Sequence, residues 1–348
     1  MSNLFYFPGL LLAGVGMAAT ALGFAENRVW LVAISLAALW IASITNVFGL
    51  AVGKWTGSLG ALSTCFTGGM LVALGAVVWL QSGSATPMHI LPEWDVDRLN
   101  FWSQIAFAFG GIELAAIMGG EIRNPQKMVP RAAWMSGLAI AAFYIAGTVA
   151  ILVLLPSGRV SVVIGLVQAA GAASARLGIG WPPLVIACTI CLGVMGQLAV
   201  WIAGTARLPF VIGIDHYLPP VFGRLHPRWR TPHFSILILS GACTVFLIAM
   251  QAGENLRIGY QLLVDMTVIL YFVPFLYLFG AAWKCGARLS SAGGLLVTVL
   301  AVALSFVPPP DVSSIWMFEL KLVGGFVVLA AGARGCFQRY ARQTAPPV

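Results

Sequence analysis

The stretch Phe101-Trp-Ser-Gln-Ile-Ala-Phe-Ala-Phe-Gly-Gly-Ile-Glu-Leu-Ala-Ala-Ile-Met-Gly-Gly120 decides the fold of this chain. Its length and apolar composition suit a helix that crosses a lipid bilayer. Glu113 nevertheless lies past its middle, where a carboxylate is costly and usually faces a cavity or a polar partner. The pair Gly110-Gly111 interrupts the same stretch, and each glycine lowers helix stability by ~1 kcal/mol relative to alanine.

Two interpretations of this glycine pair are open. In the first, the helix opens in mid-membrane and leaves backbone groups free to meet a solute. In the second, the glycines admit a neighbouring helix and Glu113 is hydrogen-bonded nearby. Phe107 and Phe109 flank the pair, where aromatic rings either close over a ligand or face lipid.

The composition indicates a polytopic membrane protein. Of 348 residues, 60% are hydrophobic and only 9% are charged, whereas a soluble domain carries about 25% charged residues. The net charge of +8 needs no nucleic acid to explain it, because cytoplasmic loops of membrane proteins collect Lys and Arg. No polar stretch is long enough for a soluble domain, so residues 1–348 are expected to form a single transmembrane domain.

Apolar segments separated by polar breaks predict about ten transmembrane helices. Each is close to the ~20 residues that a helix needs to cross the hydrocarbon layer. The first is interpreted as an uncleaved span, because no basic residue precedes it. The spans are 4–23, 29–51, 58–80, 101–120, 132–155, 182–206, 233–252, 260–283, 289–307 and 316–337.

The basic residues predict the orientation of these spans. Thirteen of them fall in alternate connections and the C-terminal tail, and six fall on the opposite side. Both termini are therefore expected in the cytoplasm. The connection 207–232 is expected to lie along the cytoplasmic interface, partly as a short helix. The acidic connection 82–100 is expected outside. The thirteen are Lys54, Arg123, Lys127, Arg131, Arg207, Arg224, Arg228, Arg230, Lys284, Arg288, Arg334, Arg339 and Arg342.

Cofactor chemistry is not indicated by the sequence. The motif formed by Cys188 and Cys191 stands in an apolar span without further ligands, so packing is the favoured interpretation. The four histidines form no cluster for a haem or a metal. Phosphate-loop, HExxH and nucleophile-elbow motifs are absent from the sequence.

Few charged residues lie inside the predicted spans. Asp265 stands about two turns into its span and nine residues before Pro274. It is either a second polar contact in a pathway or a residue at the outer interface. Glu319 and Lys321 lie at the start of the last span, where their heads reach water.

Several runs of the sequence resemble amino acid permeases of the amino acid–polyamine–organocation (APC) superfamily. The sixth helix of that family is similar to Phe107-Ala-Phe-Gly-Gly-Ile-Glu113, Glu121-Ile-Arg-Asn-Pro125 and Val129-Pro-Arg-Ala132. Its eighth helix and following loop resemble Gly204-Thr-Ala-Arg-Leu-Pro209, Gly213-Ile-Asp-His-Tyr-Leu-Pro219 and Thr231-Pro232. Tyr271 and Pro274 fit its tenth helix.

The resemblance implies a LeuT-like fold with a five-plus-five inverted repeat, in which the first and sixth helices break at the substrate. The ten spans then correspond to family helices three to twelve. In this reading Gly110 and Gly111 form the unwound turn, Phe107 is an aromatic gate and Glu113 couples proton movement. The residues expected at the substrate are Phe107, Ala108, Phe109, Gly110, Gly111 and Asp265.

The chain also departs from the family pattern. The first two helices of the family have no counterpart, so the fold is expected to be truncated at the N-terminus and half of the substrate site to be absent. The lysine that some proton-coupled members carry in the fifth helix is also lacking in 58–80. This absence leaves Glu113 as the candidate for coupling, or indicates exchange without protons.

The implied function is secondary active transport of amino acids or related amines across the plasma membrane by alternating access, with protons or by exchange. The alternative is a truncated, transport-inactive membrane protein or structural subunit of the same ancestry. A membrane enzyme is a third reading, but it would need Glu113 and Asp265 as its only acid–base pair. No cofactor and no catalytic residue is expected.

Overall fold

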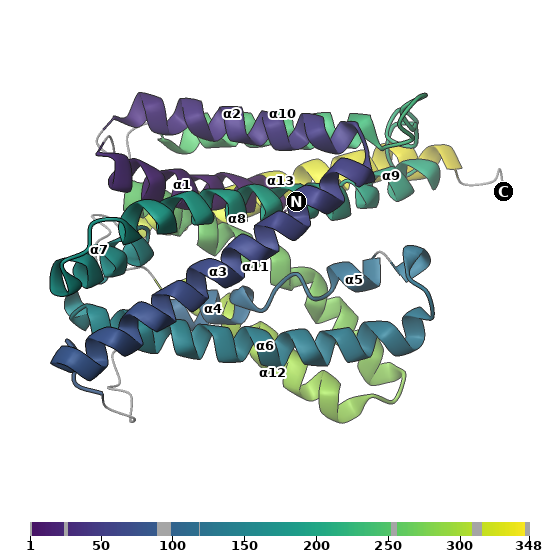
Figure 1. Cartoon of the computed structure of the whole chain (residues 1–348). Helices are drawn as coiled ribbons and strands as arrows, with labels where there is room; N and C mark the ends of the chain where they lie inside the picture. Colours follow the sequence, from purple (N-terminus) through teal and green to yellow (C-terminus); the bar gives the residue numbers. More distant parts are fainter. Residues whose placement is uncertain are drawn as a thin grey trace.

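The computed structural model describes residues 2–23, 27–88, 99–117, 119–251, 256–307 and 315–344. Among these residues the secondary structure is helical, without strands, as the sequence predicted. One-turn 3₁₀ segments lie at Gly119–Glu121 and Ser157–Arg159. The α-helices (Figure 1) are α1 (Asn3–Leu22), α2 (Arg28–Val47), α3 (Leu50–Ser82), α4 (Asn100–Ala108), α5 (Leu114–Ile117), α6 (Pro125–Leu154), α7 (Gly165–Leu177), α8 (Pro182–Thr205), α9 (Arg207–Ile214), α10 (His233–Gln251), α11 (Leu256–Lys284), α12 (Arg288–Leu304) and α13 (Ile315–Thr344).

Seven stretches of the described chain are long and apolar enough to cross a membrane. Three of the ten spans that the sequence predicted are not among these seven. The predicted span 101–120 is divided into α4 and α5. α10 itself has 19 residues, and the part of it whose side chains are described, His233–Ile248, is apolar. α12 (Arg288–Leu304) is a shorter apolar helix. The seven are Asn3–Leu22, Val29–Val47, Trp55–Ser82, Pro125–Leu154, Pro182–Ile214, Tyr260–Lys284 and Ile315–Tyr340.

Local sequence signals set several helix ends. The side chain of Asn27 accepts a hydrogen bond from the Trp30 backbone N–H at 3.2 Å, which caps the start of α2. Proline stands at the first helical position of α6 and of α8, where its missing N–H is not needed. These caps and prolines explain why α6 starts at Pro125, seven residues before the predicted span.

Two helices lie in segments that the sequence assigned to connections. The predicted short helix in 207–232 is confirmed as α9. The helix α7 was not predicted, because its residues were assigned to a connection. Most of the acidic connection, residues 89–98, lies outside the described part of the chain.

The helices are arranged in layers (Figure 1). α2 packs on α10, and both pack on α1, which also contacts α8 and α11. Serine hydroxyls link the α2–α10 pair, because Ser43 and Ser240 share a hydrogen bond of 2.6 Å. Trp40 also donates to the Thr244 hydroxyl at 3.2 Å. Such bonds between helices suit an apolar surrounding.

The long helix α3 crosses α8 at very close range. A Cβ atom added at Gly60 would lie only 2.5 Å from the Cα of Gly196. Next to this crossing, the Thr67 hydroxyl donates to Thr189 at 2.7 Å. The crossing therefore requires glycine on both helices, which is a frequent solution for helix contacts in membranes.

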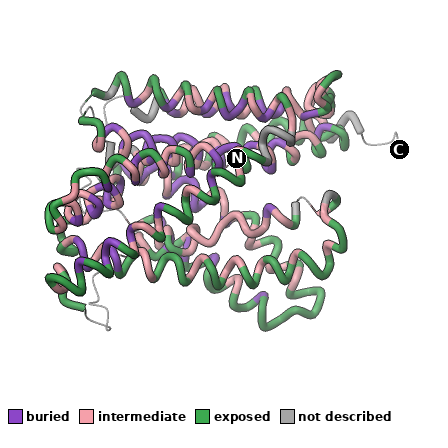
Figure 2. The backbone as a smooth tube through the Cα atoms, viewed as in Figure 1, coloured by how far each residue is buried: buried purple, intermediate pink, exposed green. Residues whose placement is uncertain are grey.

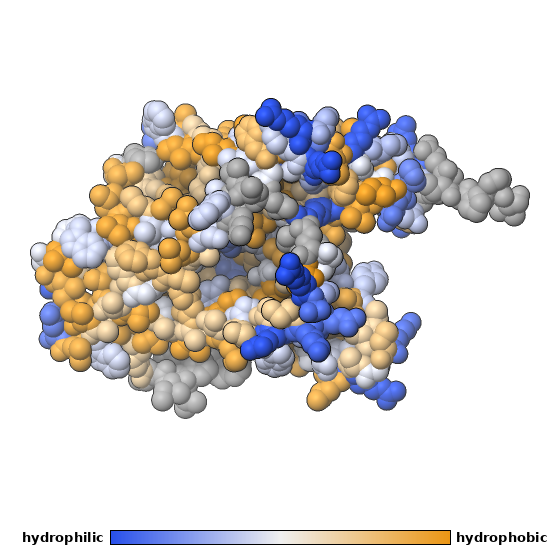
Figure 3. Space-filling model, turned by 45° about the vertical axis from the view of Figure 1, so that its right-hand side comes forward, coloured by the Kyte–Doolittle hydropathy of each residue, from blue (hydrophilic) through white to orange (hydrophobic). Residues whose placement is uncertain are grey.

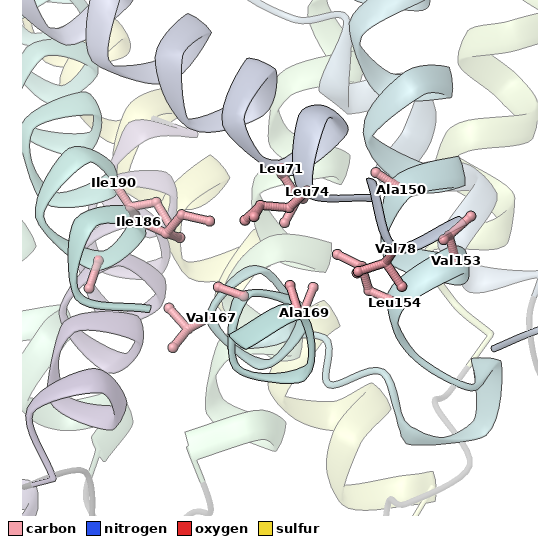
Figure 4. Packing of buried hydrophobic residues seen from close by; sticks show 13 residues of the cluster. Leu71, Leu74, Val78, Ala150, Val153, Leu154, Val167, Ala169, Ile186 and Ile190 are labelled. Atoms are coloured by element: carbon pink, nitrogen blue, oxygen red, sulfur yellow. The ribbon is translucent and has the colours of Figure 1, made fainter. Parts of the chain in front are cut away.

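Buried apolar side chains form separate clusters between the helices. One cluster joins α3, α6, α7 and α8 and includes Leu71, Val78, Leu154 and Ile186 (Figure 4). The outward faces are exposed (Figure 2), and they carry large apolar residues such as Leu80 and Leu289, each 90% exposed. This distribution is expected of a bundle whose outer surface contacts lipid.

The connections that carry the thirteen basic residues lie at one end of the bundle. Figure 1 places α5, the helix α9 and the C-terminal end of α13 at this end, together with the turn between α11 and α12. On the face shown in Figure 3, many hydrophilic side chains gather at the same end, while apolar ones cover much of the remainder. The fold thus separates a basic end from an apolar belt.

Candidate functional site

The site forms where α4 stops. α4 ends at Ala108, α5 begins at Leu114, and the residues between them form turns. The Gly110 N–H donates to the Phe107 carbonyl at 2.7 Å, which closes the last turn of α4. Gly111 then takes a φ of 101°, so the chain leaves the helical path at the position that the glycine pair predicts.

The backbone N–H of Gly111 is the polar centre of the break. It lies 2.8 Å from Oε2 of Glu113 and 3.2 Å from the hydroxyl oxygen of Tyr271 on α11. Glu113 is half-buried. Its carboxylate therefore stabilises the opened backbone of its own segment, a combination that neither interpretation from the sequence contained in full.

The two glycines are needed for different reasons. A Cβ at Gly110 would lie 2.8 Å from the Phe107 carbonyl oxygen and 3.0 Å from the Tyr271 hydroxyl oxygen. A Cβ at Gly111 would lie 3.2 Å from the Trp201 ring, and its φ of 101° is a conformation that residues with side chains rarely adopt. Gly110 permits the close approach of Tyr271 to the backbone, whereas Gly111 permits the turn.

Aromatic rings from three other helices surround the break. The Phe107 ring meets Tyr6 of α1 edge to face, with centroids 5.5 Å apart, and meets Tyr271 in the same way at 5.1 Å. Tyr6 also contacts Trp201 of α8 at 5.1 Å. This row of rings closes one side of the break, so Phe107 is held by packing between aromatic partners.

The opposite side of the break faces α6. The Tyr144 hydroxyl donates to the Ala108 carbonyl at 3.1 Å. The ring of Tyr144 also meets Phe109, with centroids 6.1 Å apart. Ala108 and Phe109, which the sequence assigned to the substrate, therefore both contact α6, and Tyr144 satisfies one carbonyl at the end of α4.

A cavity of about 560 Å³ opens beside the break, between α3, α6 and α8. Gly111 lines it, with the polar side chains of Thr64, Tyr144 and Gln197. This volume lies in the range of about 300–1,000 Å³ that is usual for small-molecule sites. A second cavity of about 320 Å³ shares Thr64, Tyr144 and Gln197 with the first, so the two adjoin. The amide nitrogen of Gln197 donates to the Tyr6 hydroxyl at 2.6 Å.

Asp265 lies apart from this group. It is completely buried on α11, and neither of the two cavities is lined by it. It lies six positions before Tyr271, which is about 9 Å of helix rise. Its predicted contact with substrate is not tested by this geometry and stays a prediction.

Sequence reasoning missed several residues of the site. Tyr6, Tyr144, Gln197 and Trp201 all stand in uninterrupted apolar spans, where a single aromatic or polar residue is ordinary. Tyr271 was connected only with a family helix and not with Glu113. The sequence signal was therefore restricted to the broken segment, and the partners that complete it come from α1, α6, α8 and α11.

Comparisons with known proteins agree with this architecture. The model of the family described as amino acid permease matches residues 1–327. An uncharacterized transporter of Legionella pneumophila is 26% identical over 87% of the chain and 70% of its own length. A protein of Lactococcus lactis named as a probable agmatine/putrescine antiporter is 23% identical over 76% of the chain and 57% of its own length. An uncharacterized transporter of Mycobacterium bovis is 26% identical over 69% of the chain, and the match spans about half, 52%, of that relative.

Proposed function

The chain belongs to the amino acid permease family, and we propose that it moves amino acids or related amines across the plasma membrane by alternating access. Transport of this kind changes no bond in the substrate, so no catalytic residue is assigned. The observation that carries the proposal is the broken segment at Gly110-Gly111, whose Gly111 N–H is shared by Glu113 and Tyr271.

The groups around the break favour a substrate with a cationic amino group. Glu113 supplies a carboxylate, and the end of α4 points its carbonyl groups, with the negative end of the helix dipole, into the break. The Trp201 ring, which lines the cavity, adds an electron-rich surface that attracts cations. The name of the Lactococcus lactis relative, an agmatine/putrescine antiporter, points to amines for that protein and supports the same class here.

The proposal assigns a coupling role to Glu113. An ionised carboxylate accepts the Gly111 N–H strongly, whereas a protonated one is a weaker acceptor and loosens the break. Substrate amine and proton then compete for the same carboxylate. This competition links the movement of one to the movement of the other.

The orientation is also proposed, with both termini in the cytoplasm. The basic connections at one end of the bundle support it, since such residues collect on the cytoplasmic side. Cys285 is exposed in the turn between α11 and α12 at that end. In a variant whose only cysteine is Cys285, an impermeant maleimide should label permeabilised cells and leave intact cells unlabelled; labelling of intact cells would reverse the orientation.

Uptake by proteoliposomes tests the function. The purified chain is reconstituted and supplied with radiolabelled arginine, agmatine, putrescine, leucine and glutamate, with and without a pH gradient or the same compound inside. Uptake of the cationic compounds above protein-free vesicles is expected. No uptake of any compound under any gradient would support the alternative of a membrane protein that does not transport by itself.

A further inference from the structure

A third cavity, of about 240 Å³, lies at the basic end of the bundle, away from the break. It is enclosed by the end of α2, the junction of α8 and α9, and the turn that precedes α10. None of its described lining residues is shared with the two cavities beside Gly111. Its described lining is Asn46, Ala203, Arg207, Phe210, Leu225, Arg230, Thr231, Pro232 and Ile236.

The described lining includes two arginines and no acidic residue. Arg207 is half-buried at the first position of α9 and donates from Nη1 to the Ala203 carbonyl at 2.5 Å. A guanidinium has five N–H donors in a fixed plane, so it can contact several oxygen atoms at once. Arg230 reaches the same cavity from an exposed position. Two guanidinium groups at one cavity suit an anion with several oxygen atoms.

The turn before α10 fixes the position of Arg230. The Arg230 N–H donates to the His226 carbonyl at 2.9 Å, and the His226 N–H donates to the Thr231 carbonyl at 2.8 Å. The hydroxyl of Thr231 in turn donates to the Val47 carbonyl at the end of α2, at 2.7 Å. Arg230 itself has a φ of 50°, which is uncommon for a residue with a side chain. The turn therefore presents this arginine at a defined place beside α2.

The surroundings of the cavity have the character of a membrane interface. On α9 the apolar side chains of Leu208, Val211 and Ile214 are 46–50% exposed. Trp229, next to Arg230, packs edge to face on Phe48, which is itself 47% exposed, with centroids 4.7 Å apart. Exposed apolar residues beside arginines, with a tryptophan, are typical of elements at the level of lipid headgroups.

We propose that this cavity binds the phosphate group of an anionic phospholipid, with Arg207 and Arg230 as its ligands and the acyl chains along the apolar face of α9. Basic pockets between membrane helices bind anionic headgroups through such charge-assisted hydrogen bonds. The site is independent of transport, because it lies outside the cavities at the break. Occupation would join α2, α9 and the start of α10 through one ligand.

The experiment uses the full chain in micelles of a neutral detergent. Phosphatidylglycerol or phosphatidylcholine is added stepwise, and binding is followed by native mass spectrometry and by the thermal unfolding temperature. The variant Arg230→Gln removes one ligand at an exposed position. Arg228→Gln is the matched control, because Arg228 is exposed in the same turn, lies over the Trp229 ring at 5.8 Å and does not line the cavity.

The wild type and Arg228→Gln should bind phosphatidylglycerol in preference to phosphatidylcholine, and Arg230→Gln should bind it about fivefold more weakly. Equal affinity of the two variants would overturn the site. Inorganic phosphate and glycerol 3-phosphate form the second arm. If these soluble phosphates stabilise the wild type as much as phosphatidylglycerol does, the ligand is a soluble anion and the assignment to lipid is wrong.

Discussion

Glu113 and Tyr271 meet at one backbone donor, the N–H of Gly111, which lies 2.8 Å from the carboxylate and 3.2 Å from the phenol oxygen. The two side chains belong to segments 158 positions apart in the sequence. Their meeting ties the broken segment to α11. A change at either side chain should therefore alter the broken segment between α4 and α5.

Replacement of Gly110 by alanine should force the broken segment and α11 apart. The added Cβ would lie 3.0 Å from the Tyr271 hydroxyl oxygen and 2.8 Å from the Phe107 carbonyl oxygen, so the backbone or the ring must move. Overpacking of this kind costs about 1–3 kcal/mol. We expect a lower unfolding temperature and at least tenfold weaker substrate binding. The control is Gly137→Ala on α6, where no atom lies within 4 Å; equal binding by both variants would contradict the assigned role of Gly110.

Replacement of Glu113 by glutamine should separate the structural role of this side chain from its role in proton coupling. The amide oxygen still accepts the Gly111 N–H, so the folded state should persist with a loss near 1 kcal/mol. The side chain no longer exchanges a proton. We expect uptake that no longer changes with pH or with a pH gradient, measured in proteoliposomes. A pH profile identical to that of the wild type would remove Glu113 from the coupling mechanism.

Replacement of Tyr271 by phenylalanine should remove one of the two acceptors and keep the ring that packs on Phe107. The Tyr271 hydroxyl contacts both the Gly111 N–H and the Glu113 side chain, so we expect about 0.5–1.5 kcal/mol of destabilisation for each hydrogen bond lost. Uptake should decrease more than stability, because the break loses its tie to α11. Tyr277→Phe is the control on the same helix, since that side chain is 78% exposed. A Tyr271→Phe variant with the uptake of the control would show that the Tyr271 hydroxyl is dispensable.

Replacement of Gly60 by alanine should disturb the crossing of α3 and α8 and not the break itself. The added Cβ would lie 2.5 Å from the Gly196 Cα, which is backbone and cannot rotate away. We expect about 1–3 kcal/mol of destabilisation in thermal unfolding. Gly69→Ala, on the same helix and with no atom within 4 Å, should leave stability unchanged or slightly higher. Two equally stable variants would argue against the close crossing.

Lipid binding at the third cavity and transport at the break should be independent properties. Arg230→Gln should keep uptake in vesicles of neutral lipid, because its cavity shares no residue with those at the break. A loss of uptake in such vesicles would show that the turn before α10 affects transport through the fold. Comparison with Arg228→Gln in the same vesicles distinguishes this effect from a general loss of charge.

The sequence by itself determined the class of the protein and the place of the break. Hydropathy and the scarcity of charge depend on composition along the chain, so the apolar spans and the separation of basic connections could be predicted from it. Gly110-Gly111 is a local signal as well, because the conformational cost of glycine in a helix does not depend on neighbours. The short helix α9 could also be predicted locally, from the residues of the connection 207–232.

Only the tertiary structure decided which residues complete the site. An apolar span that is buried or lipid-facing nearly all around has no strong periodicity, so the sequence does not indicate which face of α1, α6, α8 or α11 turns inward. The positions of Tyr6, Tyr144, Trp201 and Tyr271 depend on that rotation and on the close crossing of α3 and α8. Glu113 shows the difference most directly. The sequence marked it as a costly charge in a membrane, and only the folded chain revealed that its partner is the opened backbone two residues before it.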